Sequence, residues 1–148
     1  MNKQICKMKK SIISFFLIVF IVACSSPLIE VVEETYPDGN PKVIKFYSEE
    51  TGTRELVKEI VYYENKQKQS EGEFKNNKMS GKWTYWYDNG NKWAEGYYIN
   101  QIEHGLKTIW HRNGQKYYEG KFENGKRIGV WNFWDETGKL VKSVDYDS

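Results

Sequence analysis

Residues 81–90 read GKWTYWYDNG, and the same pattern returns twice further along the chain. Residues 105–114 read GLKTIWHRNG, and residues 129–138 read GVWNFWDETG. The three stretches begin 24 residues apart. A period of this length is typical of an array of stacked supersecondary units, in which each unit packs mainly against its neighbours.

A second short motif recurs between these stretches, namely a glutamate, a glycine and an aromatic residue two positions later. It occurs at residues 71–74, 95–98 and 119–122. We expect the glycines of both motifs to serve the repeat structure, either where φ must be positive or where a side chain would clash with the next unit. These glycines are Gly81, Gly105, Gly129, Gly72, Gly96 and Gly120.

The local signals within each unit are those of a β-hairpin. In the third unit, runs rich in aromatic residues predict strands at 82–87 and 92–99, separated by an Asn-Gly turn at 88–91. A connection of six residues, 100–105, leads to the next unit. No sustained helical periodicity follows residue 24. We therefore predict an all-β fold, an elongated antiparallel sheet of about five stacked 24-residue hairpins over residues 35–148, the first of them degenerate.

The first residues have the composition of a signal peptide. Four lysines precede an uncharged apolar run at 11–23, which is too short to cross a bilayer comfortably. Residues 21–25 read IVACS, which resembles the lipobox of bacterial lipoproteins. This resemblance implies removal of residues 1–23, acylation of Cys24, and a tether at 24–34. An uncleaved signal anchor is the alternative.

Net charge gives no support to nucleic-acid binding. The chain carries 22 basic and 20 acidic side chains, and four of the lysines lie in 1–23. The remainder has 18 basic and 20 acidic side chains, a net of −2, which would not attract a polyphosphate. Cys6 and Cys24 are the two cysteines, so no disulfide framework is expected after cleavage.

The repeated pattern resembles MORN repeats, and in particular the bacterial variant class that is often given an antitoxin-like label. The pattern is Gly-x-Trp-x-x-Trp-x-x-x-Gly, then Glu-Gly-x-Phe/Tyr, then an Asn-Gly-x-x-x-Gly link. The resemblance covers about residues 35–146 and implies a binding or scaffolding role. An antitoxin role fits poorly with an exported lipoprotein, because a cytoplasmic toxin would be out of reach.

One aromatic row is a candidate interaction surface. The residue five positions after the leading glycine of each unit is aromatic, and the residue four positions after it is apolar. Adjacent residues of a strand point to opposite faces, so both faces of the sheet carry an apolar row. Both rows could be structural, with cross-strand aromatic pairs joining the hairpins. Alternatively, the fifth-position row could be partly exposed and dock a partner or stack on sugar rings. The residues of that row are Tyr62, Trp86, Trp110 and Trp134.

The sequence offers no catalytic constellation. Glu71, Glu95 and Glu119 recur once per unit, whereas catalytic carboxylates gather at one place. His104 and His111 have no cluster of metal ligands at suitable spacing. We expect no enzyme activity, metal or cofactor.

The function predicted from these observations is that of a non-catalytic lipoprotein of the bacterial cell envelope, in the outer membrane if the cell is Gram-negative. Its partners would be the bilayer, through acylated Cys24, and another envelope protein, through the repeat sheet. A glycan or cell-wall ligand, bound through the repeated tryptophans, is the alternative.

Overall fold

The computed structural model describes residues 27–50 and 52–148. The predicted signal peptide at 1–23 and Cys24 lie outside the described residues. Within the described part, the chain is made of β-strands joined by turns, and it contains no helix that could cross a membrane. The strands are β1 (Ile29–Thr35), β2 (Pro41–Glu50), β3 (Thr53–Tyr62), β4 (Lys68–Lys75), β5 (Lys78–Trp86), β6 (Lys92–Ile99), β7 (Ile102–Glu103), β8 (Gly105–Trp110), β9 (Lys116–Glu123), β10 (Lys126–Trp134) and β11 (Leu140–Asp145).

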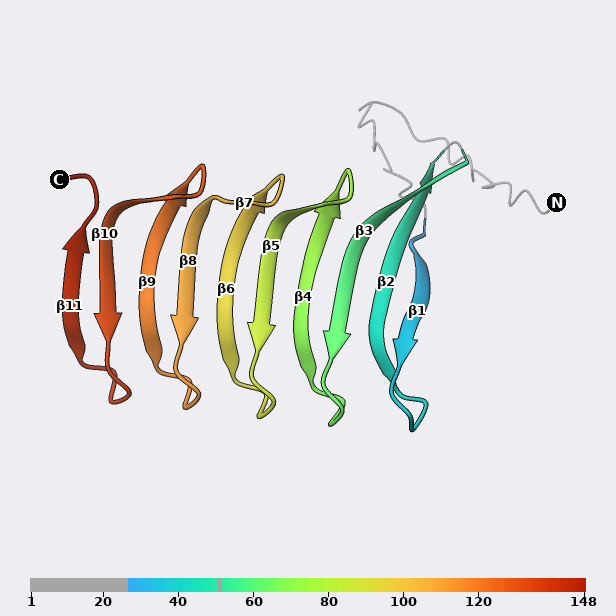
Figure 1. Cartoon of the computed structure of the whole chain (residues 1–148), viewed down its shortest axis with the longest axis horizontal. Coiled ribbons are helices and arrows are strands. Elements are labelled where there is room, and N and C mark those ends of the chain that lie inside the picture. The colour runs from blue at the N-terminus through green and yellow to red at the C-terminus, as the bar shows by residue number, and fades with distance from the viewer. Residues whose placement is uncertain (1–26, 51) are drawn as a thin grey trace, which may run out of the picture.

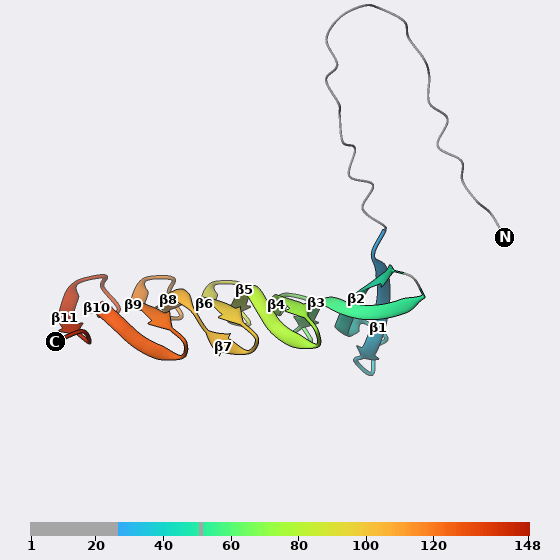
Figure 2. The ribbon, with the colours of Figure 1, turned by 90° about the horizontal axis from the view of Figure 1, so that it is seen from above.

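The strands form one open antiparallel sheet in which spatial order follows chain order. The path is β1-β2-β3-β4-β5-β6-β8-β9-β10-β11, and the two-residue β7 pairs with β6. Figure 1 shows the strands side by side along the length of the molecule, and Figure 2 shows that they curve. The predicted all-β fold, an elongated sheet of stacked hairpins, is confirmed.

Five similar turns lie along one long edge of the sheet, at the bottom of Figure 1. In each, the backbone N–H of the first residue donates to the carbonyl of the fifth, and the N–H of the fourth donates to the carbonyl of the first. We call these turns the turn row. Its members are 36–40, 63–67, 87–91, 111–115 and 135–139.

The opposite edge differs from the prediction of six-residue connections. The link at 76–81 is a two-residue turn, Asn76-Asn77, followed directly by β5. Asn76 and Asn77 have φ values of 53° and 58°, the left-handed conformation that a tight hairpin turn requires and that asparagine tolerates. The strand then passes through Gly81, which has φ 67° and lies within a shift in register between Ser80 and Trp83. The sequence interpretation therefore assigned the first residues of the strand to the connection.

The two faces of the sheet carry different side chains. Cross-strand pairs such as Trp83 with Gly96 and Tyr85 with Ala94 lie on one face, and pairs such as Thr84 with Glu95 lie on the other. We call the first the aromatic face; it carries Trp83, Tyr85, Ile109, Tyr118 and Trp131. We call the second the charged face; it carries Lys82, Thr84, Glu95, Thr108 and Glu119.

The core is thin, since the sheet is a single layer. Trp131 is fully buried, and Trp83 is nearly so, because each indole ring lies on a glycine of the preceding strand. The indole N–H of Trp83 donates to the carbonyl of Glu73 at 3.0 Å. Aromatic rings, with glycines opposite them, therefore supply the burial that a second layer supplies in most sheets.

Candidate functional site

The predicted aromatic row lies on the charged face, where its strands enter the turn row. Trp86, Trp110 and Trp134 are each half-buried, and a lysine ammonium from the preceding strand, in the previous hairpin, stands over each indole ring. Tyr62 occupies the same position in β3 and is also half-buried. The lysine–ring distances are 5.9 Å for Lys68 and Trp86, 5.5 Å for Lys92 and Trp110, and 5.5 Å for Lys116 and Trp134. The lysine side chains thus cover part of each indole ring and make cation–π contacts with it.

The same lysines pair with the repeated glutamates. Lys92 contacts Glu95 at 2.7 Å, and Lys116 contacts Glu119 at 2.7 Å. Hydrogen bonds from Lys116, together with one from Thr108, hold the pKa of Glu119 below its usual value, although partial burial opposes this. A set of indole, ammonium and carboxylate therefore recurs at three successive junctions between hairpins, and in each set the carboxylate is paired with lysine.

Glu71 and Glu95 each sit between two lysines. Burial is the largest single influence on the pKa of Glu95 and raises it, but the hydrogen bonds from Lys92 and Lys82 together outweigh burial, so the pKa is lowered. Glu71 shows the same balance between burial and its two lysines. Both carboxylates are therefore paired with one lysine of their own strand and one of a neighbouring strand.

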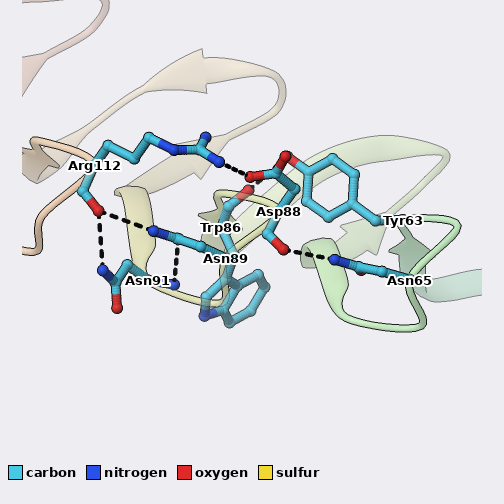
Figure 3. A network of polar contacts seen from close by, with 7 residues as sticks. All are labelled: Tyr63, Asn65, Trp86, Asp88, Asn89, Asn91 and Arg112. Atoms are coloured by element: carbon cyan, nitrogen blue, oxygen red, sulfur yellow. Dashed lines mark hydrogen bonds and ion pairs between the residues drawn. The ribbon is translucent and has the colours of Figure 1, made fainter.

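The turn row is joined from hairpin to hairpin by side chains that reach one unit along the sheet. The Tyr63 hydroxyl donates to the carbonyl of Trp86 at 2.8 Å, and Asn65 donates its amide to the carbonyl of Asp88 at 2.6 Å (Figure 3). In the next turn Asn91 donates to the carbonyl of Arg112 at 2.9 Å, and Arg112 forms an ion pair with Asp88. This edge is a continuous polar ladder.

Tyr36, Tyr87 and His111 repeat the contact that Tyr63 makes. They donate to the carbonyls of Tyr62, Trp110 and Trp134 at 2.8, 2.9 and 3.0 Å. The carbonyls that accept belong to the four residues of the predicted interaction row. The backbone of that row is therefore part of the inter-hairpin ladder.

A hollow of about 620 Å³ opens on the aromatic face beside the turn row, between the third and fourth hairpins. Its wall is formed by Tyr87, Trp93, Ile109, His111, Tyr117 and Tyr118, with Trp110, Arg112 and Glu136 also lining it. Trp93 and Tyr117 are both 46% exposed, and burial raises the pKa of Tyr118. We call this site the aromatic hollow.

Sequence reasoning missed Trp93 and Tyr117, although they stand 24 residues apart at equivalent places in two units. Each follows a lysine at the start of a strand, and the pairing register shifts at that point, between Tyr85 and Trp86 and between Ile109 and Trp110. The periodic aromatic residue directly after the turn was the signal that could have identified them.

The fourth hairpin departs from the tryptophan pattern in another way. Lys107 occupies the position of Trp83 and Trp131, forms an ion pair with Glu103, and stands over the ring of Phe122 at 5.7 Å. Burial pushes the pKa of Lys107 down, but the hydrogen bond to Glu103 and nearby tyrosines outweigh it, so the net change is upward. The aromatic face thus contains one paired charge in its middle.

Neither histidine belongs to a metal site in the described part of the chain. The backbone N–H of His104 donates to the carbonyl of Tyr97, and His111 belongs to the turn-row ladder. Among residues 27–50 and 52–148, no group of three or more His, Cys, Asp or Glu side chains could hold a metal ion.

A second hollow, of about 460 Å³, lies at the register shift between β9 and β10 and is lined by charged-face residues. Leu106 and Val130 line it and are 43% and 55% exposed. Tyr97, on β6 of the same face, is 43% exposed. We call these three residues the apolar patch.

Comparison with solved structures finds distant similarity to two structures of one protein. A mutant of S. aureus TarM in complex with Fondaparinux, alpha-GlcNAc-glycerol and UDP is 13% identical, with a TM-score of 0.34, and the match covers 80% of this chain and 20% of that one. A second TarM structure is 12% identical, with a TM-score of 0.32, over 78% and 19% of the two chains. This chain therefore spans about a fifth of these proteins, and the likeness is too weak to carry an argument. No curated protein matches the chain.

The family model described as "MORN repeat variant" matches four consecutive segments, at residues 57–76, 79–100, 103–124 and 127–148. The matches begin in β3, so the first hairpin lies before them. Together they cover more than half of the chain, and their boundaries follow the tight turns opposite the turn row. The chain belongs to the MORN repeat variant family.

Proposed function

We propose that this protein is an exported lipoprotein of the bacterial cell envelope, anchored through acylated Cys24, whose repeat sheet is a non-catalytic module that binds a protein partner. The lipobox-like IVACS at 21–25 supports the anchor. Two or more acyl chains give stable attachment, whereas one chain binds a membrane only marginally.

The apolar patch is the observation that carries the protein-binding role. Tyr97, Leu106 and Val130 expose apolar surface on one face of a single-layer sheet, and Leu106 and Val130 line the 460 Å³ hollow. Contiguous exposed apolar surface marks protein interaction sites. The Trp110 ring on the same face, with Lys92 over it, adds a tryptophan, one of the residue types enriched in binding hot spots.

The paired state of the repeated glutamates supports a non-catalytic role. Glu95 and Glu119 hold lysines, and their lowered pKa values keep them ionised. This pattern is distributed along the sheet, so it lacks the convergence of acid, base and binding pocket that catalysis requires.

The test is affinity purification of the lipidated protein from its own membranes after mild cross-linking, with Val130→Asp beside the wild type. Val141→Asp is the matched control, because Val141 is 58% exposed on β11, outside the apolar patch. We expect one discrete protein with the wild type and with Val141→Asp, and its loss with Val130→Asp. Recovery of the same protein with Val130→Asp would contradict the proposed surface.

The anchor is tested separately with Cys24→Ser. We expect this variant to lose incorporation of labelled palmitate and to leave the detergent phase on phase partitioning. Retention of label in Cys24→Ser would contradict acylation at this residue.

A further inference from the structure

We propose that the aromatic hollow binds a neutral glycan, with pyranose rings stacked on Trp93 and Tyr117. The hollow lies on the aromatic face, whereas the protein partner proposed above uses the charged face. The two sites can therefore be tested, and can fail, independently.

Both exposed rings are held in place by other rings. Trp93 packs against Tyr85, with ring centroids 5.8 Å apart, and against Tyr87 at 6.3 Å. Tyr117 packs against His111 at 4.8 Å and Tyr118 at 5.3 Å. The two rings are nevertheless 46% exposed each. Such rings form a rigid platform, and a ligand that stacks on them orders few side chains on binding.

The spacing of the platform fits a short oligosaccharide. Trp93 and Tyr117 stand at equivalent positions of consecutive hairpins, two strands apart, which places them about 10 Å from one another along the sheet, close to the length of a disaccharide. The C–H bonds on one face of a pyranose carry partial positive charge, and the face of an aromatic ring carries partial negative charge. The floor between the rings includes the buried Ile109.

The polar groups of the hollow favour a neutral ligand over an anionic one. The Arg112 guanidinium stands over the Tyr87 ring at 5.5 Å and is already paired with Asp88. Glu136 lines the same hollow and would repel a phosphate or sulfate. These planar groups can still donate to and accept from sugar hydroxyls, which carry no charge.

The aromatic pair is restricted to two hairpins, which argues against a purely structural role. The equivalent positions in the second and fifth hairpins are Gln69 and Val141. If the fold required an aromatic ring directly after each turn, those hairpins would need one as well. Both lie within segments matched by the repeat family, as Trp93 and Tyr117 do.

The test is titration of the full-length chain with chitotetraose and with cellotetraose, followed by tryptophan fluorescence and calorimetry. The protein is kept in a detergent without a sugar headgroup. Trp93→Ala and Tyr117→Ala remove one ring each, and Trp93→Phe keeps a ring in place. Tyr97→Ala is the matched control, since Tyr97 is 43% exposed on the charged face. Circular dichroism and melting temperature show that each variant folds.

We expect at least one of the two sugars to bind, and Trp93→Ala or Tyr117→Ala to weaken that binding about tenfold or more, as loss of a stacking contact commonly does. Trp93→Phe should retain most of the affinity, and Tyr97→Ala should not change it. The proposal is overturned if neither sugar binds with a Kd below about 10 mM, or if binding is unaffected by both alanine variants. It is equally overturned if a sulfated oligosaccharide binds more tightly than the neutral ones.

Discussion

Two indole rings of the core lie directly against glycines. A Cβ at Gly72 would come within 2.0 Å of the Trp83 ring, and a Cβ at Gly120 within 2.1 Å of the Trp131 ring. Gly96 is the same motif position in the hairpin between them, but Lys107 stands there in place of tryptophan, and its nearest atom would be 3.7 Å away. The three glycines therefore differ in what they accommodate.

We expect Gly72→Ala and Gly120→Ala to lower the free energy of unfolding by about 3 kcal/mol each, the cost of overpacking a tight contact. Gly96→Ala should change it by about 1 kcal/mol or less, in either direction, because the new methyl group meets ordinary contact distances. Urea denaturation of the three variants measures this. Equal destabilisation at all three positions would show that the indole contacts do not set the requirement for glycine.

The residue-scale pattern could be predicted only in part from the sequence. The 24-residue spacing singled out Gly72, Gly96 and Gly120 together. The spacing did not separate Gly96 from the other two glycines, because the difference depends on which side chain of the neighbouring strand lies against each glycine. Beside Gly120, the strand pairing shifts in register between Ile128 and Asn132. Knowledge of the register was needed to place each indole ring on its glycine.

At the scale of elements, the tyrosines of the turn row tie each hairpin to the next. Tyr63→Phe and Tyr87→Phe keep the ring and remove one hydrogen bond, of 2.8 and 2.9 Å respectively, to a backbone carbonyl. Each should lower the free energy of unfolding by about 1 kcal/mol, the usual value for a partly buried hydrogen bond. Thermal or urea unfolding measures the loss. Tyr97→Phe, on an exposed ring of the charged face, is the control, and an equal loss there would contradict a specific role for the ladder.

The glutamates of the charged face make stability dependent on pH. Burial raises the pKa of Glu71, but hydrogen bonds from Lys58 and Lys68 outweigh it, so the folded-state pKa lies below the ordinary 4.5. Glu119, held mainly by Lys116, also has a lowered pKa. A carboxyl group whose pKa is lowered by folding stabilises the fold above its unfolded pKa, and this contribution is lost as the pH falls through the folded pKa.

We therefore expect the free energy of unfolding to fall as the pH drops below about 4.5, and Glu71→Gln to make this decline shallower. Urea denaturation from about pH 7 to pH 3 measures the slope. Glu64→Gln removes a charge from an exposed residue of the turn row and is the control. The same slope in wild type and Glu71→Gln would contradict the assignment.

Element boundaries were predictable where turns carry Asn-Gly, and less so where the register shifts. The strand predicted at 92–99 coincides with β6, whereas β5 begins at Lys78, four residues before the predicted start. The aromatic hollow was missed for a related reason. If side chains simply alternated between the two faces, Trp93 and Ala94 would lie on different faces of the sheet. The shift in register beside Trp86 instead allows Trp93 to pack on Tyr85, which is the cross-strand partner of Ala94.

At the scale of the whole molecule, the sheet has two ends and no second layer among the described residues. In that part of the chain β1 pairs only with β2, and β11 only with β10. The ladder of the turn row ends at Asp135, whose carboxylate accepts from the N–H groups of Thr137 at 2.9 Å and Lys139 at 3.1 Å, within its own turn. An ionised carboxylate cannot donate onward as Tyr87 and His111 do, so the ladder stops there.

Because each hairpin contacts only its neighbours, damage to one should stay local. Gly120→Ala disturbs the contact with Trp131 near one end of the sheet, and Gly72→Ala disturbs the contact with Trp83 nearer the other. In native-state hydrogen exchange we expect Gly120→Ala to speed exchange in β9, β10 and β11 while β2 and β3 keep their protection. Gly72→Ala should speed exchange in β4 and β5 and leave β10 protected.

The two variants thus serve as controls for each other, since they add the same methyl group to the same motif. If both raised exchange uniformly from β1 to β11, the array would unfold as one cooperative unit, and a ligand held by the third and fourth hairpins would then protect every strand equally.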